Sequence, residues 1–197
     1  MAYAYGVHDV ETSLQDSLEE AILHGIVVSN LACFVGREMN LPEETCHNLA
    51  VAGMVHDIGK LRLRSYVYEE KGAKLNIDEL RYVRLHPTLG YAILKEHGYN
   101  EEVLTAVLYH HENVDGSGYP NNLTKDDIPL CARILRVCDA FGALIANRAY
   151  RSAFDIETAI TIMIEEVKNY DMKVFLAFQK VTQSDDMCSM LFSLGIH

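Results

Sequence analysis

Apolar residues recur at three- and four-residue steps from about Val10 to Met39, the pattern of a helix with one buried face. Pro42 suits the first turn of a second helix, and the two glutamates after it suit the positive end of that helix. This second helix would bury Leu49 and Ala52 and deliver His56-Asp57 at its C-terminal end. The chain therefore begins with two amphipathic helices.

Helical patterns continue along the chain, whereas strand signals are scarce. A capping box at Asn76 and Glu79 indicates a short helix, and His86-Pro87 indicates a break. Thr124 with Asp127 suggests a further helix start. Longer helices are predicted at about 88–98, 100–111, 130–147, 155–168, 172–181 and 185–194.

Two segments interrupt this pattern. Residues 60–76 mix charge, tyrosine and glycine without periodicity, which predicts a loop or lid. Residues 115–120, Asp-Gly-Ser-Gly-Tyr-Pro, predict a turn, because two glycines and a proline in six residues are incompatible with a helix. No repeat, low-complexity tract or linker is visible. We therefore expect an all-α fold with one compact domain over residues 1–197, a motif-bearing core at about 18–151, C-terminal helices at 155–197 and no separate sensor domain.

Composition narrows the class of protein. The net charge of -11 argues against binding to nucleic-acid polymers. The longest apolar run, Ala21 to Val35, is interrupted by polar residues and is shorter than the roughly 20 residues of a membrane span. The N-terminus shows no secretion signal, so a cytoplasmic location without a membrane partner is expected. The five cysteines stand singly, without C-x-x-C spacing, and are interpreted as small core residues.

The central chemical feature is His56-Asp57-Ile58-Gly59-Lys60, which places an imidazole beside a carboxylate. Adjacent residues on a helix point about 100° apart, so the other ligands of a metal site must come from other segments. Glu20 and His24 share one helix face, and Asp139 lies among apolar neighbours where an unpartnered carboxylate would be costly. The candidate ligands are Glu20, His24, His56, Asp57, His86, His110, His111 and Asp139.

The number of candidate ligands limits the chemistry. A single tetrahedral zinc ion needs three or four ligands, whereas eight suffice for two or three ions bridged by carboxylates. Ions about 3.5–4 Å apart clamp an in-line phosphoryl displacement, which predicts phosphoester hydrolysis. No serine or cysteine stands in a nucleophile motif. Taken singly, each histidine could be a core or surface residue, and Glu20 could be a solvated helix residue.

These motifs resemble the HD-GYP family, a branch of the HD phosphohydrolases. The resemblance rests on His56-Asp57-Ile58-Gly59-Lys60, on His110-His111-Glu112 and on the Gly118-Tyr119-Pro120 turn. It implies an all-helical fold, two or three metal ions, usually iron or manganese, and hydrolysis of the bacterial messenger cyclic di-GMP to pGpG or GMP.

The resemblance also implies residue roles. His24, His56, Asp57 and Asp139 would hold one ion, Asp57 would bridge to a second ion with His86 and His110, and Glu20 with His111 would support a third. Asp57 and Lys60 are the candidate catalytic residues, with Lys60 offsetting charge on the phosphate. Lys60, Arg148 and Arg151 are the candidate substrate-binding residues. The Gly-Tyr-Pro turn would shape the site or dock a partner such as a diguanylate cyclase domain.

This chain departs from the family pattern at three places. Gly142 stands where the family commonly has aspartate, Ala149 replaces the proline of Arg-Pro-Tyr, and the loop after Lys60 lacks the usual proline. These changes leave open a catalytically weak cyclic-dinucleotide sensor or a hydrolase of a related cyclic dinucleotide. An HD phosphohydrolase acting on nucleotides is a further alternative, disfavoured by the complete Gly-Tyr-Pro turn.

Overall fold

A computed structural model describes residues 18–63, 83–147 and 152–196 of the chain. Within these ranges the structure is helical and contains no β-strand, and Asp115 and Thr124 form an isolated bridge. The predicted all-α fold is confirmed. One hydrophobic core includes residues from the first described helix to the last.

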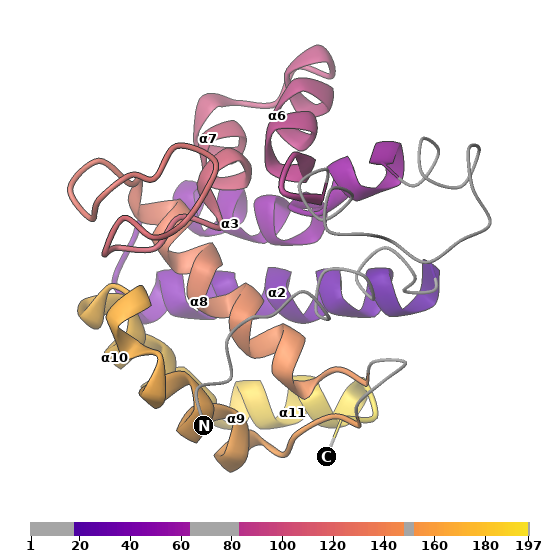
Figure 1. Ribbon diagram of the computed structural model, residues 1–197. Helices are drawn as coiled ribbons and strands as arrows, with labels where there is room; N and C mark the ends of the chain where they lie inside the picture. The colour runs from indigo at the N-terminus through magenta and orange to yellow at the C-terminus, as the bar shows by residue number, and fades with distance from the viewer. Residues whose placement is uncertain (1–17, 64–82, 148–151, 197) are drawn as a thin grey trace.

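The central element is α2 (Leu18–Glu38), which runs across the middle of the molecule in Figure 1. It packs against α3 (Glu43–Val55), α8 (Leu130–Ile145) and α10 (Met172–Thr182). The predicted apolar face is buried, with Val28, Leu31 and Val35 fully inaccessible to solvent. Figure 1 shows α3, α6 (His86–Glu96) and α7 (Glu101–Tyr109) on one side of α2. On the other side lie α9 (Ile156–Glu165), α10 and α11 (Asp185–Ser193).

By length and composition alone, α2 could span a membrane between Glu19 and Glu38. This differs from the expectation for the shorter run Ala21 to Val35, because the helix extends beyond that run at both ends. A buried core helix meets the same criterion. In this structure α2 packs against α3, α8, α10 and α11 and carries His24 among buried residues.

A glycine brings α2 and α3 close together. A Cβ atom on Gly53 would lie 2.7 Å from the Cα of Ser29, so only glycine permits this approach of the two backbones. The contact places the end of α3 beside the middle of α2. After α3, residues 58–63 are again helical.

The C-terminal region forms three helices, as predicted. They are α9 (Ile156–Glu165), α10 and α11 (Asp185–Ser193), with a short 3-10 turn η1 (Val167–Asn169) between the first two. Asp155, Asp171 and Ser184 cap these helices, each accepting a hydrogen bond from a backbone N–H of the first turn.

Several local predictions need correction or fall outside the described residues. Residues 124–127 form a turn instead of starting a helix, and α8 begins only at Leu130, after Pro129. His86 is the first residue of α6, because a proline in the first helical turn lacks only an N–H that would be unpaired there. The predicted loop does not begin at residue 60, because residues 60–63 are helical. The rest of the predicted loop, the capping box at 76–79 and residues 10–17 lie outside the described residues.

Candidate metal centre

Five separate segments bring imidazole and carboxylate groups to one place. Most of these groups stand at helix ends, where the chain changes direction and the side chain can turn inward. His56 and His110 are the C-terminal caps of α3 and α7, and His86 opens α6. His24 comes from within α2 and Asp139 from within α8. Asp57 and His111 follow directly on the two caps.

Asp139 lies between three histidines. Its Oδ1 atom is 3.1 Å from His24 Nε2 and 3.5 Å from His56 Nε2, and its Oδ2 atom is 3.9 Å from His111 Nδ1. Asp139 therefore connects α2, the end of α3 and the end of α7. This partnership explains why a carboxylate is tolerated among the apolar residues of α8.

Asp57 is the second connecting carboxylate. Its Oδ1 atom lies 3.3 Å from His86 Nε2, and its Oδ2 atom lies 3.4 Å from His56 Nε2. The Nζ of Lys60 donates a hydrogen bond of 2.7 Å to the same Oδ2. Asp57 thus stands between the two histidine groups, as a bridging ligand would, with a cation beside it.

Three of the histidines share one backbone contact. His56, His86 and His110 each donate the Nδ1 hydrogen to the carbonyl oxygen three residues earlier, on Gly53, Val83 and Val107, at 2.6–2.8 Å. The neutral imidazole then keeps its lone pair on Nε2. All three Nε2 atoms face the centre, which is the arrangement that metal-ligating histidines use.

The electrostatics favour a cation at this place. Burial disfavours ionised carboxyl groups, yet Lys60 and His56 hold the pKa of Asp57 well below its usual value. For Asp139, the hydrogen bond with His24 and the nearby ring of His56 overcome burial and also lower the pKa strongly. Burial would keep His56 neutral, but the two carboxylates raise its pKa to about 10. The space between His56 and the carboxylates therefore attracts a positive charge, either a proton or a metal ion.

His86 and His110 also favour a bound cation. Burial lowers the pKa of His86 to about 3 and that of His110 to about 4, so both rings are neutral at pH 7. Their Nε2 atoms lie 3.2 Å apart, although neither carries a proton to share. In addition, His56 Nε2 and Asp57 Oδ1 are buried without a hydrogen-bond partner. Facing lone pairs and orphaned acceptors are the features that a bound cation would satisfy.

The ligand atoms fall into three overlapping groups, each within 4.8 Å. These are His24, His56 and Asp57; His56, His110 and Asp139; and His86, His110 and His111. Imidazole together with carboxylate suits zinc, iron and manganese. The residues present therefore fit a centre of more than one ion.

The glycine of the His-Asp-Ile-Gly-Lys motif has a packing role. A Cβ atom on Gly59 would lie 2.0 Å from the carbonyl oxygen of His86 and 2.8 Å from the backbone nitrogen of Gly90. Any side chain at this position would push α6 away. Gly59 thus allows His86 to reach Asp57.

The Gly-Tyr-Pro turn folds back on the metal-bearing residues. A Cβ atom on Gly118 would lie 2.3 Å from the backbone nitrogen of Asn113, so glycine is required there. The ring of Tyr119 stacks on His111 at 4.7 Å between centroids, and the guanidinium of Arg84 lies 5.2 Å from the Tyr119 ring centre. The buried carboxylate of Glu112 accepts backbone hydrogen bonds from Asn121 and Leu123.

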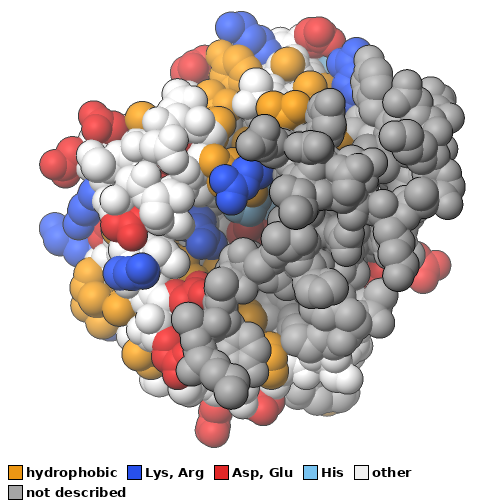
Figure 2. All heavy atoms as spheres, in the orientation of Figure 1, with side chains coloured by type: hydrophobic (Ala, Val, Ile, Leu, Met, Phe, Trp, Pro, Cys, Tyr) orange, Lys and Arg blue, Asp and Glu red, His pale blue; other side chains and the backbone are white. Residues whose placement is uncertain are grey.

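Figure 2 shows a small area of His surface near the middle of one face, with Lys or Arg and Asp or Glu side chains next to it.

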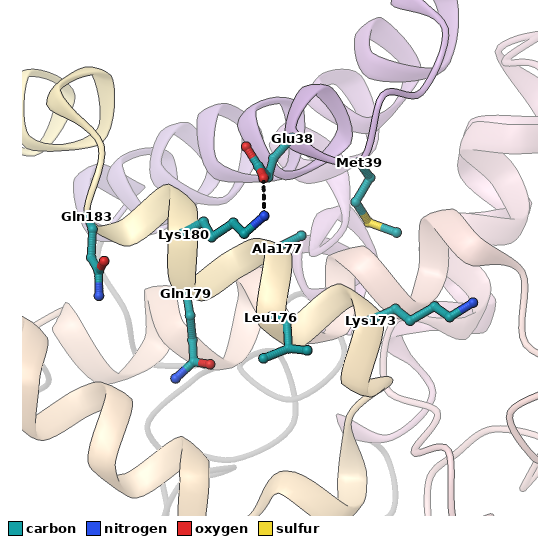
Figure 3. Close-up of a pocket in the computed structure, with 8 residues that line it drawn as sticks. All are labelled: Glu38, Met39, Lys173, Leu176, Ala177, Gln179, Lys180 and Gln183. Carbon is teal, nitrogen blue, oxygen red and sulfur yellow. Dashed lines mark hydrogen bonds and ion pairs between the residues drawn. The ribbon is translucent and has the colours of Figure 1, made fainter.

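A surface pocket away from the metal centre is lined by different kinds of residue. It lies between the end of α2 and α10, where Lys180 pairs with Glu38, and Leu176 is among its lining residues (Figure 3). Its lining includes no histidine, so it does not belong to the metal centre.

Comparison with known proteins agrees with this geometry. The family model described as the HD domain matches residues 10–174, which is most of the chain. This chain belongs to the HD domain family. The resemblance to the HD-GYP family that the sequence motifs indicated is confirmed, and so is the predicted all-α fold.

Curated relatives of this chain are named as phosphodiesterases of cyclic dinucleotides. The chain is 34% identical over 168 residues to the cyclic di-GMP phosphodiesterase PA4108 of Pseudomonas aeruginosa, covering 85% of this chain and 40% of the relative. It is 33% identical over 147 residues to the 3'3'-cGAMP-specific phosphodiesterase 3 of Vibrio cholerae, covering 74% and 32%. The chain therefore spans less than half the length of these relatives.

A solved structure shares the fold. Bd1817 of Bdellovibrio bacteriovorus, titled an HDG"Y"P protein, matches with a TM-score of 0.67 at 15% identity, over 90% of this chain and 59% of that one.

The HD fold brings together seven of the eight predicted ligands, all except Glu20. Glu20 lies one turn before His24 on α2, exposed to solvent and outside the three ligand groups. Its role as a ligand stays a prediction. Lys60 contacts the centre through Asp57, whereas Arg148 and Arg151 lie outside the described residues.

Sequence reasoning missed Arg84 and the role of Glu112. Arg84 stands two residues before His86 in a segment without periodicity, so no pattern marks it. Glu112 directly follows the histidine pair and precedes a glycine-rich turn, and this position could have indicated that its carboxylate binds the backbone of the turn.

Proposed function

We propose that this HD domain is a metal-dependent phosphodiesterase that hydrolyses cyclic di-GMP to pGpG, GMP or both. The observation that carries the proposal is the convergence of five imidazoles and two carboxylates on one point, with three ligand groups each within 4.8 Å. The cyclic di-GMP phosphodiesterase of Pseudomonas aeruginosa, which is 34% identical over 85% of this chain, supports the substrate class.

The proposal includes two or three divalent transition-metal ions, with iron or manganese as the expected metals. His24, His56, Asp57 and Asp139 would hold one ion, and Asp57, His86 and His110 a second. His111 lies with His86 and His110 and would serve a third ion with Glu20. When bound, such ions activate water and stabilise charge on phosphoryl oxygens.

The chain's own residues would position the substrate. Lys60, held at 2.7 Å from Asp57, supplies a positive charge at the edge of the centre for a phosphate oxygen. Arg84 is exposed and stacks with Tyr119 next to His111, where it can meet a second phosphate or a base. Arg148 and Arg151 are proposed to hold guanine or phosphate.

A turnover assay tests this proposal. The protein is prepared without oxygen, loaded with iron or manganese and given cyclic di-GMP, and cyclic di-GMP, pGpG and GMP are separated over time. Oxygen is excluded because iron bound by histidine and carboxylate can be oxidised. We expect metal-dependent loss of cyclic di-GMP, absent in Asp57→Ala and retained in Leu176→Ala, a change at the remote surface pocket. No hydrolysis by the fully loaded protein would contradict the proposal.

A second candidate substrate is 3'3'-cGAMP, because a specific phosphodiesterase for it is 33% identical over 74% of this chain. A parallel assay with 3'3'-cGAMP separates the two substrates by their kcat/KM values. Binding of both nucleotides without turnover would instead identify a sensor.

We also propose a location and a partner for the protein. We place the protein in the bacterial cytoplasm as one HD-GYP-type domain, with the Gly-Tyr-Pro turn as the surface for a partner such as a diguanylate cyclase domain.

A further inference from the structure

His24 differs from the other histidines of the centre in its backbone contacts. His56, His86 and His110 each donate the Nδ1 hydrogen to a carbonyl oxygen of the preceding turn. The Nδ1 atom of His24 is buried and has no hydrogen-bond partner among the described residues. Its Nε2 atom lies 3.1 Å from Asp139 Oδ1.

The residue beside this unpartnered nitrogen is Gly142, which follows Asp139 by three positions on α8. A Cβ atom at position 142 would lie 3.2 Å from His24 Nδ1 and 3.1 Å from Val28 Cγ2. A side chain at this position would therefore point at Nδ1. Glycine leaves that nitrogen without an acceptor.

The missing acceptor decides where His24 carries its proton. In the neutral ring, a hydrogen on Nε2 can be donated to Asp139, whereas a hydrogen on Nδ1 would be buried and unpaired. The metal-free protein therefore holds His24 as the Nε2–H tautomer. His86 and His110 hold the opposite tautomer, with Nε2 available to a metal.

We propose that Gly142 makes His24 the weakest ligand of the metal centre, so that the ion held by His24 and Asp139 is the first to be lost. The inference rests on the metal centre of the proposed function. Coordination through His24 Nε2 requires its proton to move to Nδ1, where no acceptor awaits it. An orienting partner of a ligating histidine typically changes metal affinity about 10- to 100-fold. Position 142 is thus a positioning site that sets how firmly this ion is held.

The test compares four proteins: wild type, Gly142→Ala, Gly142→Asn and Gly142→Asp. Alanine adds the Cβ atom without an acceptor, asparagine adds an acceptor without charge, and aspartate adds both. The Cβ atom that all three variants add requires His24 and Val28 to yield by only a few tenths of an ångström, because both contacts are with side chains. Competition with a chelator then gives the affinity for the ion that is lost first.

We expect asparagine and aspartate to raise that affinity about 10-fold or more, and alanine to leave it near the wild-type value. An equal gain in alanine would show that packing is responsible and would overturn the inference. Unchanged affinity in both asparagine and aspartate variants would overturn it as well.

A second readout needs neither metal nor activity. In the metal-free protein, ¹⁵N shifts of the His24 ring, assigned with His24→Gln, should show the proton on Nε2 in wild type and Gly142→Ala, and on Nδ1 in Gly142→Asn. A wild-type proton on Nδ1 would overturn the inference even if the variants fail to fold. If the ring behaves as expected but wild type binds no metal, the proposed function fails and the tautomer assignment stands.

Discussion

The Nε2 atoms of His86 and His110 lie 3.2 Å apart, while each ring donates its Nδ1 hydrogen to a backbone carbonyl. Two lone pairs therefore face each other in a buried place. The contact is favourable only when a cation lies between or beside the two nitrogens. Because the two backbone hydrogen bonds fix both rings, the fold itself prepares this half of the centre for a metal ion.

Gly59→Ala should separate the two halves of the centre. The new Cβ atom would lie 2.0 Å from the His86 carbonyl oxygen, a backbone atom that cannot turn aside. We expect a loss of about 1–3 kcal/mol in the free energy of unfolding, measured with urea, and a reduced metal content. Gly90→Ala is the matched control, because its Cβ would meet a Val107 methyl group at 3.2 Å and would touch Gly59 N and Ile58 Cγ2 only at the ordinary contact distance of 3.6 Å. Equal metal content in both variants would contradict this role of Gly59.

Glu20→Ala tests the third ion. If Glu20 is a ligand, the loaded wild-type protein should hold close to three ions per chain, and the variant should hold one fewer. Metal analysis after removal of free metal gives both numbers. Glu19→Ala, an exposed neighbour on the same helix, is the control. Identical metal content in wild type and Glu20→Ala would leave Glu20 as a solvated helix residue.

Gly118→Val tests whether the Gly-Tyr-Pro turn supports the metal centre. A side chain there would meet the backbone of Asn113 and displace Tyr119 from His111. We expect metal content and hydrolysis to fall together, since the turn packs on a ligand. If the turn is chiefly a docking surface, the variant should keep metal and turnover but lose binding to a diguanylate cyclase domain. A variant that keeps all three properties would contradict both roles.

Asp171 should make stability depend on pH. Its buried carboxylate would be disfavoured as an ion, but the Lys173 N–H and the nearby Arg133 and Lys125 lower its pKa. Because the folded pKa lies below the unfolded value of about 3.9, the stabilisation is complete above that value and disappears as the pH falls through the folded pKa.

Asp171→Asn should therefore lower the free energy of unfolding at pH 7 by about 1–3 kcal/mol, and the difference from wild type should shrink below about pH 4. Urea unfolding from pH 7 to pH 3 measures this difference. Asp186→Asn, an exposed carboxylate on α11, is the control and should change little. A difference that stays constant across this range would disprove the linkage.

The sequence sufficed to predict most helices and most of the centre, for physical reasons. The period of the apolar residues in α2 and α8 reflects their burial against several helices. The candidate ligands were recognisable because imidazole and carboxylate are unusual at core positions such as His56 and Asp139. The boundary between the predicted helices 88–98 and 100–111 is also confirmed: Gly98 follows α6 with a positive φ of 77°, and Asn100 caps α7.

Other features depend on contacts between distant segments. Thr124 and Asp127 do form a hydrogen bond between their side chains, but the chain continues as a turn because Pro129 and the helix start at Leu130 follow too soon. The stack of Arg84, Tyr119 and His111 joins three segments and leaves no local pattern. The unpartnered Nδ1 of His24 is visible only when α2 lies against Gly142.

The most direct test of the central claim measures metal content and hydrolysis of cyclic di-GMP in the same anaerobic samples of wild type and Asp57→Ala. Asp57 lies between the two histidine groups, so in the proposed centre its loss would leave two neighbouring ions without a shared ligand. We predict at least two ions per chain and metal-dependent turnover in wild type, and the loss of more than one ion and of all hydrolysis in Asp57→Ala. A wild-type content of one ion or none would contradict the account. Turnover in Asp57→Ala within about tenfold of wild type would contradict it as well, because tenfold corresponds to only about 1.4 kcal/mol in the barrier.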